Sequence, residues 1–398
     1  MLQTPRSERL HIVLYGRTNS GKSSLINALT GQDVSLVSAI PGTTTDPVSK
    51  AIEVKGLGAC VLVDTAGFDD RDADLGHLRI KRTRDTLKLA DIAIVVMGQG
   101  ATDLEEQWIR DLQESKVPVV PVFNKGDIHS YDDKQIEAFK KSTGLSPIVV
   151  SASSGVGIDA LRKALHEAHR KDEDLSITGS LTKAGDIVML VMPQDAAAPK
   201  GRLILPQVQT IRELLDKGAI PICCTPETMA QALKGLAPPP QLIITDSQAF
   251  KAVYELKPAE SLLTSFSVLF AAYKGDIDNF VKGAQAIASL TPASRVLIAE
   301  ACTHAPESED IGTVKIPRLL RQRIGESLRI DMVAGKDFPD DLTPYDLVIH
   351  CGACMFTRKM VMNRSAQAQA QHVPMTNYGI TLAYLTGILD KVSLPERP

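Results

Sequence analysis

The chain has 398 residues, a formal net charge of −3 and 44% hydrophobic residues. This length predicts roughly two to four domains, and this composition is typical of folded, soluble protein. Binders of nucleic acid or of membrane surfaces usually have a stronger basic signature, so neither partner is expected. The first residues lack the apolar core of a signal peptide, and no apolar run approaches the ~20 residues of a membrane span. We therefore expect a cytoplasmic protein whose six cysteines do not form disulfides.

Short apolar strand patterns alternate with polar or amphipathic helical stretches in the first part of the chain. Such strand patterns lie at 11–15, 60–64, 92–96 and 117–122. Alternating strands and helices predict an α/β fold, with a parallel sheet covered on both faces.

The pattern divides the chain into three parts, 1–170, 178–264 and 265–398. We expect a nucleotide-binding domain followed by two smaller α/β domains with parallel sheets. The middle part has no catalytic constellation and is a candidate for association. Its Cys223–Cys224 pair ends an apolar strand pattern and is predicted to be buried packing. No internal repeat is visible.

A phosphate-binding loop follows the first strand pattern. Residues 16–23 read G-R-T-N-S-G-K-S, which matches G-x-x-x-x-G-K-S. Glycines let the backbone wrap around phosphate oxygens, and backbone N–H groups supply positive potential. Lys22 would neutralise the β and γ phosphates, and the Ser23 hydroxyl would bind Mg2+. The predicted nucleotide-binding residues in this segment are Gly16, Asn19, Ser20, Gly21, Lys22, Ser23 and Ser24.

Three later segments indicate guanine as the base. Asp64 ends a strand pattern, which places its carboxylate near Mg2+, and the Gly67 amide would lie near the γ-phosphate. The Asp127 carboxylate can accept hydrogen bonds from the ring N–H and amino donors of guanine, which adenine lacks at this edge. The predicted residues of the base site are Asn124, Lys125, Asp127, Ser151 and Ala152. Together these segments predict GTP and Mg2+ as ligands.

The segment G-T-T-T-D at 42–46 resembles the switch of the bacterial TrmE, Era and Der GTPases, which reads G-T-T-R-D or similar. The resemblance implies that Thr44 ligates Mg2+ and that Asn19 binds K+, which can replace an arginine finger. Phe68 stands where Ras-like GTPases have the glutamine that orients water, so hydrolysis should be slow and potassium-stimulated. The predicted catalytic residues are Lys22, Ser23, Thr44, Asp64 and Gly67.

Two cysteine and histidine clusters stand far down the chain, C-T-H at 302–304 and H-C-G-A-C at 350–354. Each follows a strand pattern, so the ligands would meet at one sheet edge if the strands are parallel neighbours. Three thiolates suit an iron–sulfur cluster, or zinc with a fourth histidine; ordinary buried cysteines are the remaining alternative. On a strand His350 would face away from Cys351, whereas His304 could turn inward from a loop. The fourth ligand stays open between His304, His350, a Glu and an exchangeable group.

With both halves present, the whole chain resembles the HydF family of iron-iron hydrogenase maturation GTPases. The resemblance implies that 178–264 is a dimerisation domain and that 265–398 binds a 4Fe-4S cluster. It also implies a homodimer that receives the diiron precursor of the H-cluster from the radical-SAM maturases HydE and HydG. The precursor would then pass to apo-hydrogenase. The alternative is a TrmE/Era/Der-like GTPase with structural zinc, acting in tRNA modification or ribosome assembly. The implied cluster ligands are Cys302, Cys351 and Cys354, with His304 as the candidate for the fourth.

Overall fold

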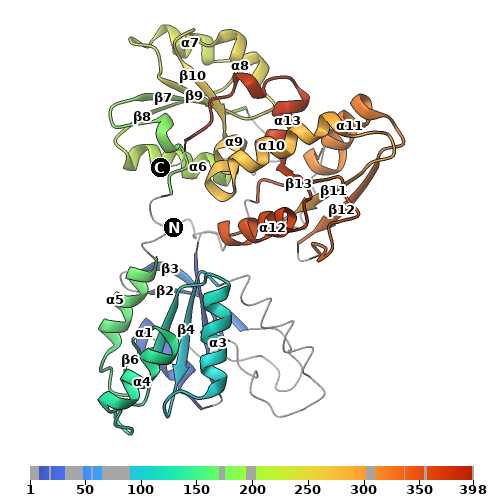
Figure 1. The fold of residues 1–398 in the computed structure, drawn as a ribbon. Coiled ribbons are helices and arrows are strands. Elements are labelled where there is room, and N and C mark those ends of the chain that lie inside the picture. The colour runs from blue at the N-terminus through green and yellow to red at the C-terminus, as the bar shows by residue number, and fades with distance from the viewer. Residues whose placement is uncertain are drawn as a thin grey trace. The chain divides into compact units, whose positions relative to one another are not determined.

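A computed structural model describes the chain as two compact units, Met1–Asp174 and Leu175–Pro398 (Figure 1). Each unit is described by itself. The described residues are 9–17, 19–31, 48–54, 57–64, 90–169, 175–193, 203–301, 310–335, 337–353 and 356–396.

The first unit is a six-stranded sheet with the order β2-β3-β1-β4-β5-β6. Only β2 is antiparallel to its neighbour. One apolar core lies against α1 and α5 and a second against α3 and α4, so helices cover both faces, as the α/β prediction requires. The strands are β1 (Leu10–Tyr15), β2 (Val48–Val54), β3 (Gly58–Asp64), β4 (Ile92–Met97), β5 (Val119–Phe123) and β6 (Ile148–Val149). The helices are α1 (Lys22–Thr30), α3 (Asp103–Glu114), α4 (Asp133–Thr143) and α5 (Ile158–His169).

The second unit contains two parallel four-stranded sheets, ordered β10-β9-β7-β8 and β12-β11-β13-β14. The strands of the first sheet are β7 (Ile187–Val191), β8 (Ile220–Cys224), β9 (Leu242–Thr245) and β10 (Leu262–Ser265). Those of the second are β11 (Arg295–Glu300), β12 (Arg329–Ala334), β13 (Leu347–His350) and β14 (Met375–Asn377). The α-helices are α6 (Leu205–Asp216), α7 (Met229–Lys234), α8 (Phe250–Leu256), α9 (Phe266–Lys274), α10 (Ile277–Gln285), α11 (Ile316–Ile324), α12 (Arg358–Ala370) and α13 (Tyr378–Leu385). Single turns lie at Gly179–Leu181, Ala286–Ser289, Ile311–Lys315 and Leu389–Lys391.

The helices of the described ranges all lack the combination of length and apolar composition that a bilayer span requires. This finding agrees with the absence of a long apolar run in the sequence.

The two sheets of the second unit repeat one topology. Numbered along the chain within each sheet, both have the strand order 2-1-3-4. They also share a hydrogen bond: the residue before the third strand accepts from the first amide of the first strand. Gln241 Oε1 accepts from Ile187 N at 2.6 Å, and Asp346 Oδ2 accepts from Arg295 N at 2.7 Å. No repeat is visible in the sequence, yet the strand order of the fold is repeated.

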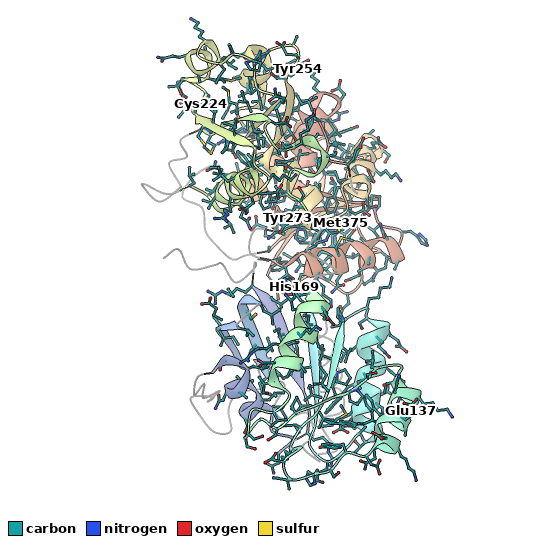
Figure 2. All side chains as sticks on the ribbon, turned by 90° about the vertical axis from the view of Figure 1, so that its left-hand side faces the viewer. Glu137, His169, Cys224, Tyr254, Tyr273 and Met375 are labelled. Atoms are coloured by element: carbon teal, nitrogen blue, oxygen red, sulfur yellow. The ribbon has the colours of Figure 1, made fainter. Side chains whose placement is uncertain are left out.

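Both sheets contribute to a common core. Figure 2 labels one residue from each, Cys224 on β8 and Met375 on β14. The helix α9 packs against α6 of the first half and against α12 and α13 of the second. The second unit is therefore one packed body, and the boundary at 264/265 stays a prediction. Core residues include Met189, Val191 and Ile243 from the first sheet and Leu297, Val348 and Met375 from the second.

The prediction that Cys223 and Cys224 are both buried is wrong for Cys223. Cys223 is exposed and Cys224 is half-buried. The reason is that β8 lies at the edge of its sheet, so one of its faces is not covered as a central strand would be.

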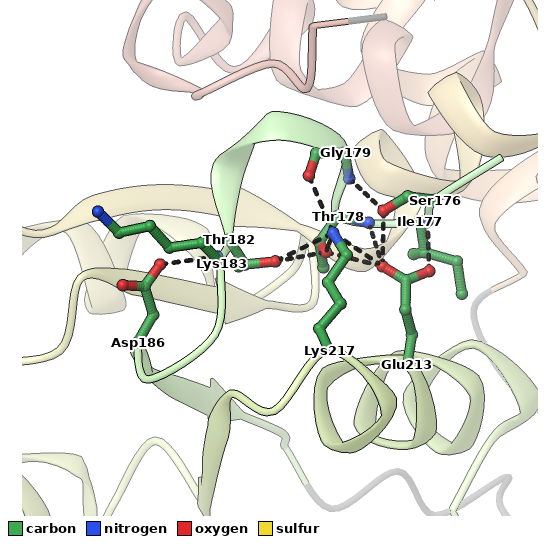
Figure 3. A network of polar contacts seen from close by, with 9 residues as sticks. All are labelled: Ser176, Ile177, Thr178, Gly179, Thr182, Lys183, Asp186, Glu213 and Lys217. Carbon is green, nitrogen blue, oxygen red and sulfur yellow. Dashed lines mark hydrogen bonds and ion pairs between the residues drawn. The ribbon is translucent and has the colours of Figure 1, made fainter. Parts of the chain in front are cut away.

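A polar network anchors the start of the second unit on α6 (Figure 3). Glu213 accepts hydrogen bonds from the amides of Ile177 (2.5 Å) and Thr178 (2.9 Å) and from the hydroxyls of Thr178 (2.7 Å) and Ser176 (2.9 Å). Lys217 lies 3.5 Å from the same carboxylate and donates to the Thr178 hydroxyl at 2.8 Å. Burial by itself would raise the pKa of Glu213, but the donated hydrogen bonds lower it overall. The ionised carboxylate therefore stabilises this junction.

Candidate functional sites

Two glycines of the phosphate-binding loop are required by close packing. A Cβ at Gly16 would lie 2.6 Å from the Val96 carbonyl oxygen. A Cβ at Gly21, which has a φ of +91°, would lie 2.2 Å from Asn124 Nδ2. Neither position can hold a larger residue without displacing its neighbours, so the loop keeps the tight course between β1 and α1 that phosphate binding requires.

The Lys22 ammonium lies over this loop. Lys22 is 8% exposed, and its Nζ donates to the carbonyl oxygens of Gly16 (2.5 Å) and Arg17 (3.0 Å). The adjacent Ser23 is exposed in the first turn of α1. Asn19 is exposed and has a φ of +62°. A cation, a hydroxyl and a helix N-terminus thus meet at one loop, which fits a magnesium nucleotide.

Asp64 lies at the same edge of the sheet. It ends β3, is 7% exposed and pairs in register with Leu14 on the neighbouring strand β1. A carboxylate at this position fits the predicted magnesium site. The remaining predicted residues of the reaction, Thr44, Gly67 and Phe68, lie outside the described residues.

Asn124 connects the phosphate loop to the base loop. It is 1% exposed, and its Nδ2 donates to the carbonyl oxygens of Ser20 (3.0 Å) and Gly21 (3.4 Å). Its Oδ1 accepts from the Ala152 amide at 3.2 Å. Sequence reasoning placed Asn124 among the nucleotide-binding residues but did not show this link. The Asn124 side chain holds the phosphate loop and the base loop together, so it contributes to nucleotide binding by positioning these loops.

The Asp127 carboxylate is oriented by two serines. Its two oxygens accept from the hydroxyls of Ser151 and Ser153, each at 2.8 Å. These hydrogen bonds, that of Ser151 first, lower the pKa of Asp127. The exposed carboxylate is therefore an ionised double acceptor, which matches the two donors on the guanine edge. Sequence reasoning missed the positioning role of Ser153, although its spacing from Ser151 was visible. Lys125, two residues before Asp127, has a φ of +62°, as the tight turn between β5 and Asp127 requires.

The second candidate site is a thiol at the edge of the second sheet. The predicted parallel pairing of the two strands is confirmed, since Ala299 on β11 pairs with His350 on β13. Cys351 follows β13, is half-buried, and its Sγ accepts from the amides of Ala301 (3.0 Å) and Ala353 (3.4 Å). Ala301, the last described residue before Cys302, therefore lies beside Cys351 at this edge.

The donor chemistry at Cys351 fits a thiolate ligand. Backbone N–H groups that point at sulfur stabilise its negative charge and tune bound iron–sulfur clusters. Among the described residues no three His, Cys, Asp or Glu side chains converge on one point. The other predicted ligands, Cys302, His304 and Cys354, lie outside the described residues.

Both ring nitrogens of His350 are engaged within the protein. The residue is fully buried, with Nε2 2.8 Å from Arg364 Nη1 and Nδ1 2.9 Å from the Cys351 carbonyl oxygen. Guanidinium only donates, so Nε2 accepts and Nδ1 carries the hydrogen. Burial, and then the charge of Arg364, lowers the pKa of His350 to about 4, so the ring is neutral. This arrangement leaves neither nitrogen for a metal.

A buried lysine holds the loop that contains the last predicted ligand. Lys274 is 4% exposed, and its Nζ donates to the carbonyl oxygens of Ala353 (3.0 Å) and Phe356 (2.9 Å), which bracket Cys354. Sequence reasoning missed Lys274 and Arg364. The only signal for Lys274 is its place at the end of an apolar run.

The fold and the loops define the class: a P-loop GTPase domain followed by a two-sheet α/β body with a thiol at one sheet edge. Family models cover these parts in order. A 50S ribosome-binding GTPase model matches residues 11–125, a hydrogen maturase F dimerization domain matches 177–275, and a hydrogen maturase F tetramerization domain matches 278–395. The chain belongs to the hydrogen maturase F (HydF) family.

The chain is also similar to tRNA modification GTPases MnmE. That of Bordetella parapertussis is 38% identical over 160 residues, which are 40% of this chain and 33% of the relative. That of Methylococcus capsulatus is 37% identical over 158 residues, 40% of this chain and 34% of the relative. The chain thus spans about a third of the length of these relatives, and the likeness concerns the GTPase domain. A solved structure of Aquifex aeolicus Era bound to GDP and aluminium fluoride is 18% identical, with a TM-score of 0.34; it covers 63% of this chain and 99% of that one. This score is too low to carry an argument.

The family models extend the predicted assembly. The sequence predicted a dimer through the middle domain, and a dimerization model covers that part. A tetramerization model covers most of the part predicted to bind the cluster. The family models therefore support oligomerisation and match both halves of the second unit, whereas the sequence predicted association only through the middle part.

Proposed function

We propose that this protein is a GTP-hydrolysing carrier that holds a 4Fe-4S cluster at the edge formed by β11 and β13. The observation that carries the proposal is the position of Cys351 Sγ, which accepts the Ala301 amide hydrogen next to Cys302. The ligands would be Cys302, Cys351 and Cys354. His304, a Glu or an exchangeable group would complete the set, since both His350 nitrogens are used.

The carrier role follows from the family. The bound cluster would supply iron with an exchangeable position. The protein would receive the diiron precursor of the H-cluster from HydE and HydG, in the cytoplasm, and deliver it to apo-hydrogenase as part of a homodimer or a larger assembly. The residues themselves provide the thiolate edge and a GTP switch. GTP can drive a rearrangement that changes affinity for partners.

The GTPase would use the loop around Lys22 for the phosphates, Asp127 for the base, and Ser23 with Thr44 and Asp64 for Mg2+. Hydrolysis would be slow and stimulated by K+ held through Asn19. The contacts of Lys22 with the loop and of Asp127 with Ser151 and Ser153 support the phosphate and base assignments.

Anaerobic reconstitution with iron and sulfide tests the proposal. Optical and EPR spectra of the full chain should show a 4Fe-4S cluster, and Cys302→Ser should lose it. Cys223→Ser is the matched control, because this cysteine is exposed on β8 and outside the site. A colourless protein that contains zinc and takes up no iron would overturn the carrier role.

A second candidate function is that of a TrmE/Era/Der-like GTPase with structural zinc. The observation that favours it is the similarity of the GTPase domain to MnmE. Metal analysis of the purified protein and a tRNA-binding assay separate the two. Zinc with specific tRNA binding supports this candidate, whereas iron without tRNA binding supports the carrier.

A further inference from the structure

Arg364 on α12 is a buried cation without an acidic partner among the described residues. It is 8% exposed, and its Nη2 donates to the Gly335 carbonyl oxygen at 2.6 Å while Nη1 donates to His350 Nε2. The rings of Phe338 and Phe356 lie 4.5 Å and 4.6 Å from its guanidinium carbon, so aromatic groups flank the charge. No carboxylate within the described ranges is in ion-pair distance of it.

A buried charge is costly unless an opposite charge lies nearby. The ionisable group that interacts favourably with Arg364 is the Cys351 thiol. The histidine between them connects the two, because His350 accepts from Arg364 and donates to the Cys351 backbone. Among the described residues, the negative charge that favours this cation is therefore the one carried at the Cys351 sulfur.

The first sheet provides an internal comparison. Thr245 occupies the position of His350, since Thr245 pairs with the fifth residue of β7 as His350 pairs with the fifth residue of β11. Asp246 then occupies the position of Cys351. The helix that follows, α8, has no buried charged side chain. The buried cation thus accompanies the thiol and is not a general feature of this topology.

We infer that Arg364 is a positioning residue for the cluster: its charge stabilises the thiolate-bound, negatively charged group at Cys351. His350 is neutral and is not an iron ligand; its two hydrogen bonds hold the Arg364 guanidinium in place relative to the Cys351 backbone. This inference rests on the proposed function for the identity of the bound group. A thiolate-ligated 4Fe-4S cluster carries net negative charge, and reduction adds one electron. A fixed cation nearby therefore favours the reduced form.

A redox titration monitored by EPR tests the electrostatic role. The full chain is reconstituted anaerobically, and the electron comes from dithionite through mediators. Removing the charge in Arg364→Met should make reduction less favourable by about tenfold in equilibrium constant. Arg364→Lys, which keeps the charge, should stay close to wild type. Equal midpoint potentials in all three proteins would overturn the inference.

Pulsed EPR tests the role of His350. The nitrogen couplings of the reduced cluster should be the same in wild type and in His350→Gln, because glutamine can also accept from Arg364. A strong coupling in wild type that disappears in His350→Gln would show that His350 is a ligand, which contradicts the inference.

A cluster-free measurement keeps the inference separate from the proposed function. In the apo-protein, the rate at which iodoacetamide alkylates Cys351 reports thiolate character and is followed by peptide mass spectrometry. Arg364→Met should slow this rate by about tenfold and leave Cys223 unchanged. Should Arg364→Met fail to fold by circular dichroism, Arg364→Gln takes its place. Wild type that takes up no iron defeats the carrier role, while an unchanged alkylation rate defeats the inference about Arg364.

Discussion

The two sheets of the second unit have the same strand order and different chemistry at the same edge. Where the first sheet has Thr245 and Asp246, the second has His350 and Cys351. The Thr245 hydroxyl donates to the backbone of its own sheet at 2.9 Å, and Asp246 accepts from the Gln207 side chain at 3.1 Å. In the second sheet, His350 accepts from the buried Arg364, and the Cys351 sulfur accepts from two backbone amides. The comparison teaches that the topology provides an edge, and that a few residues decide which chemical groups that edge presents.

The largest expected effect separates the two edges directly. Cys351→Ser should abolish formation of the 4Fe-4S cluster, because serine replaces a thiolate with a poor ligand for iron. Asp246→Ser at the equivalent position of the first sheet is the control and should leave the iron content unchanged. Iron and sulfide analysis after reconstitution measures both. Equal loss of iron in the two variants would mean that the edges are not functionally distinct.

The second prediction asks whether the thiol edge is independent of the GTPase. Lys22→Ala should lower GTP hydrolysis by about 100-fold, because charge stabilisation at the phosphates is lost. The cluster spectrum should not change, while hydrogenase activation in coexpression should fall. Phosphate-release assays and EPR on the same sample measure this. Loss of the cluster in Lys22→Ala would contradict separate roles.

The third prediction concerns the polar network around Glu213, which anchors residues 176–178 before the first of the two sheets. Glu213→Gln should lower the free energy of unfolding by about 2 kcal/mol at neutral pH, because amide donors would then face an NH2 group. The pKa of Glu213 is lowered from 4.5, so its stabilisation is present above that value and lost as the pH falls through the lowered pKa.

Urea unfolding at about pH 7 and at about pH 3 measures this effect, since the difference between wild type and Glu213→Gln should shrink in acid. Arg212→Gln is the control, because its contact with Asp216 is exposed and should contribute little. A difference that persists in acid would show that charge is not the cause.

The smallest effect concerns the cation that assists hydrolysis. Replacing potassium with sodium should slow GTP hydrolysis on the order of tenfold. The reason is that a site selective for K+ would stay empty in sodium, so its positive charge near the phosphates would be lost. Asn19→Ala should remove this difference between the two salts. Phosphate release in matched buffers measures the rates, and equal wild-type rates in both salts would exclude a potassium site.

Much of the molecule was predictable from the sequence because its signals are local. The phosphate loop occupies consecutive residues between a strand and a helix, and the α/β class follows from alternating apolar patterns. The parallel pairing of the two strands that precede the cysteine clusters was predictable, because each cluster follows an apolar strand pattern. Strand alternation also indicated that His350 would not face the same way as Cys351.

Only the tertiary structure decided what surrounds these motifs. Lys274 lies 79 residues from the Ala353 carbonyl that it binds, and Arg364 reaches His350 from another element. Such contacts depend on how helices pack on a sheet, which no local pattern encodes. The repeated topology was also hidden, because buried strands of either sheet accept many apolar residues while the backbone course stays the same. The sequence by itself determined the types and spacing of the candidate ligand residues. Packing determined which charged side chains, such as Lys274 and Arg364, lie near them.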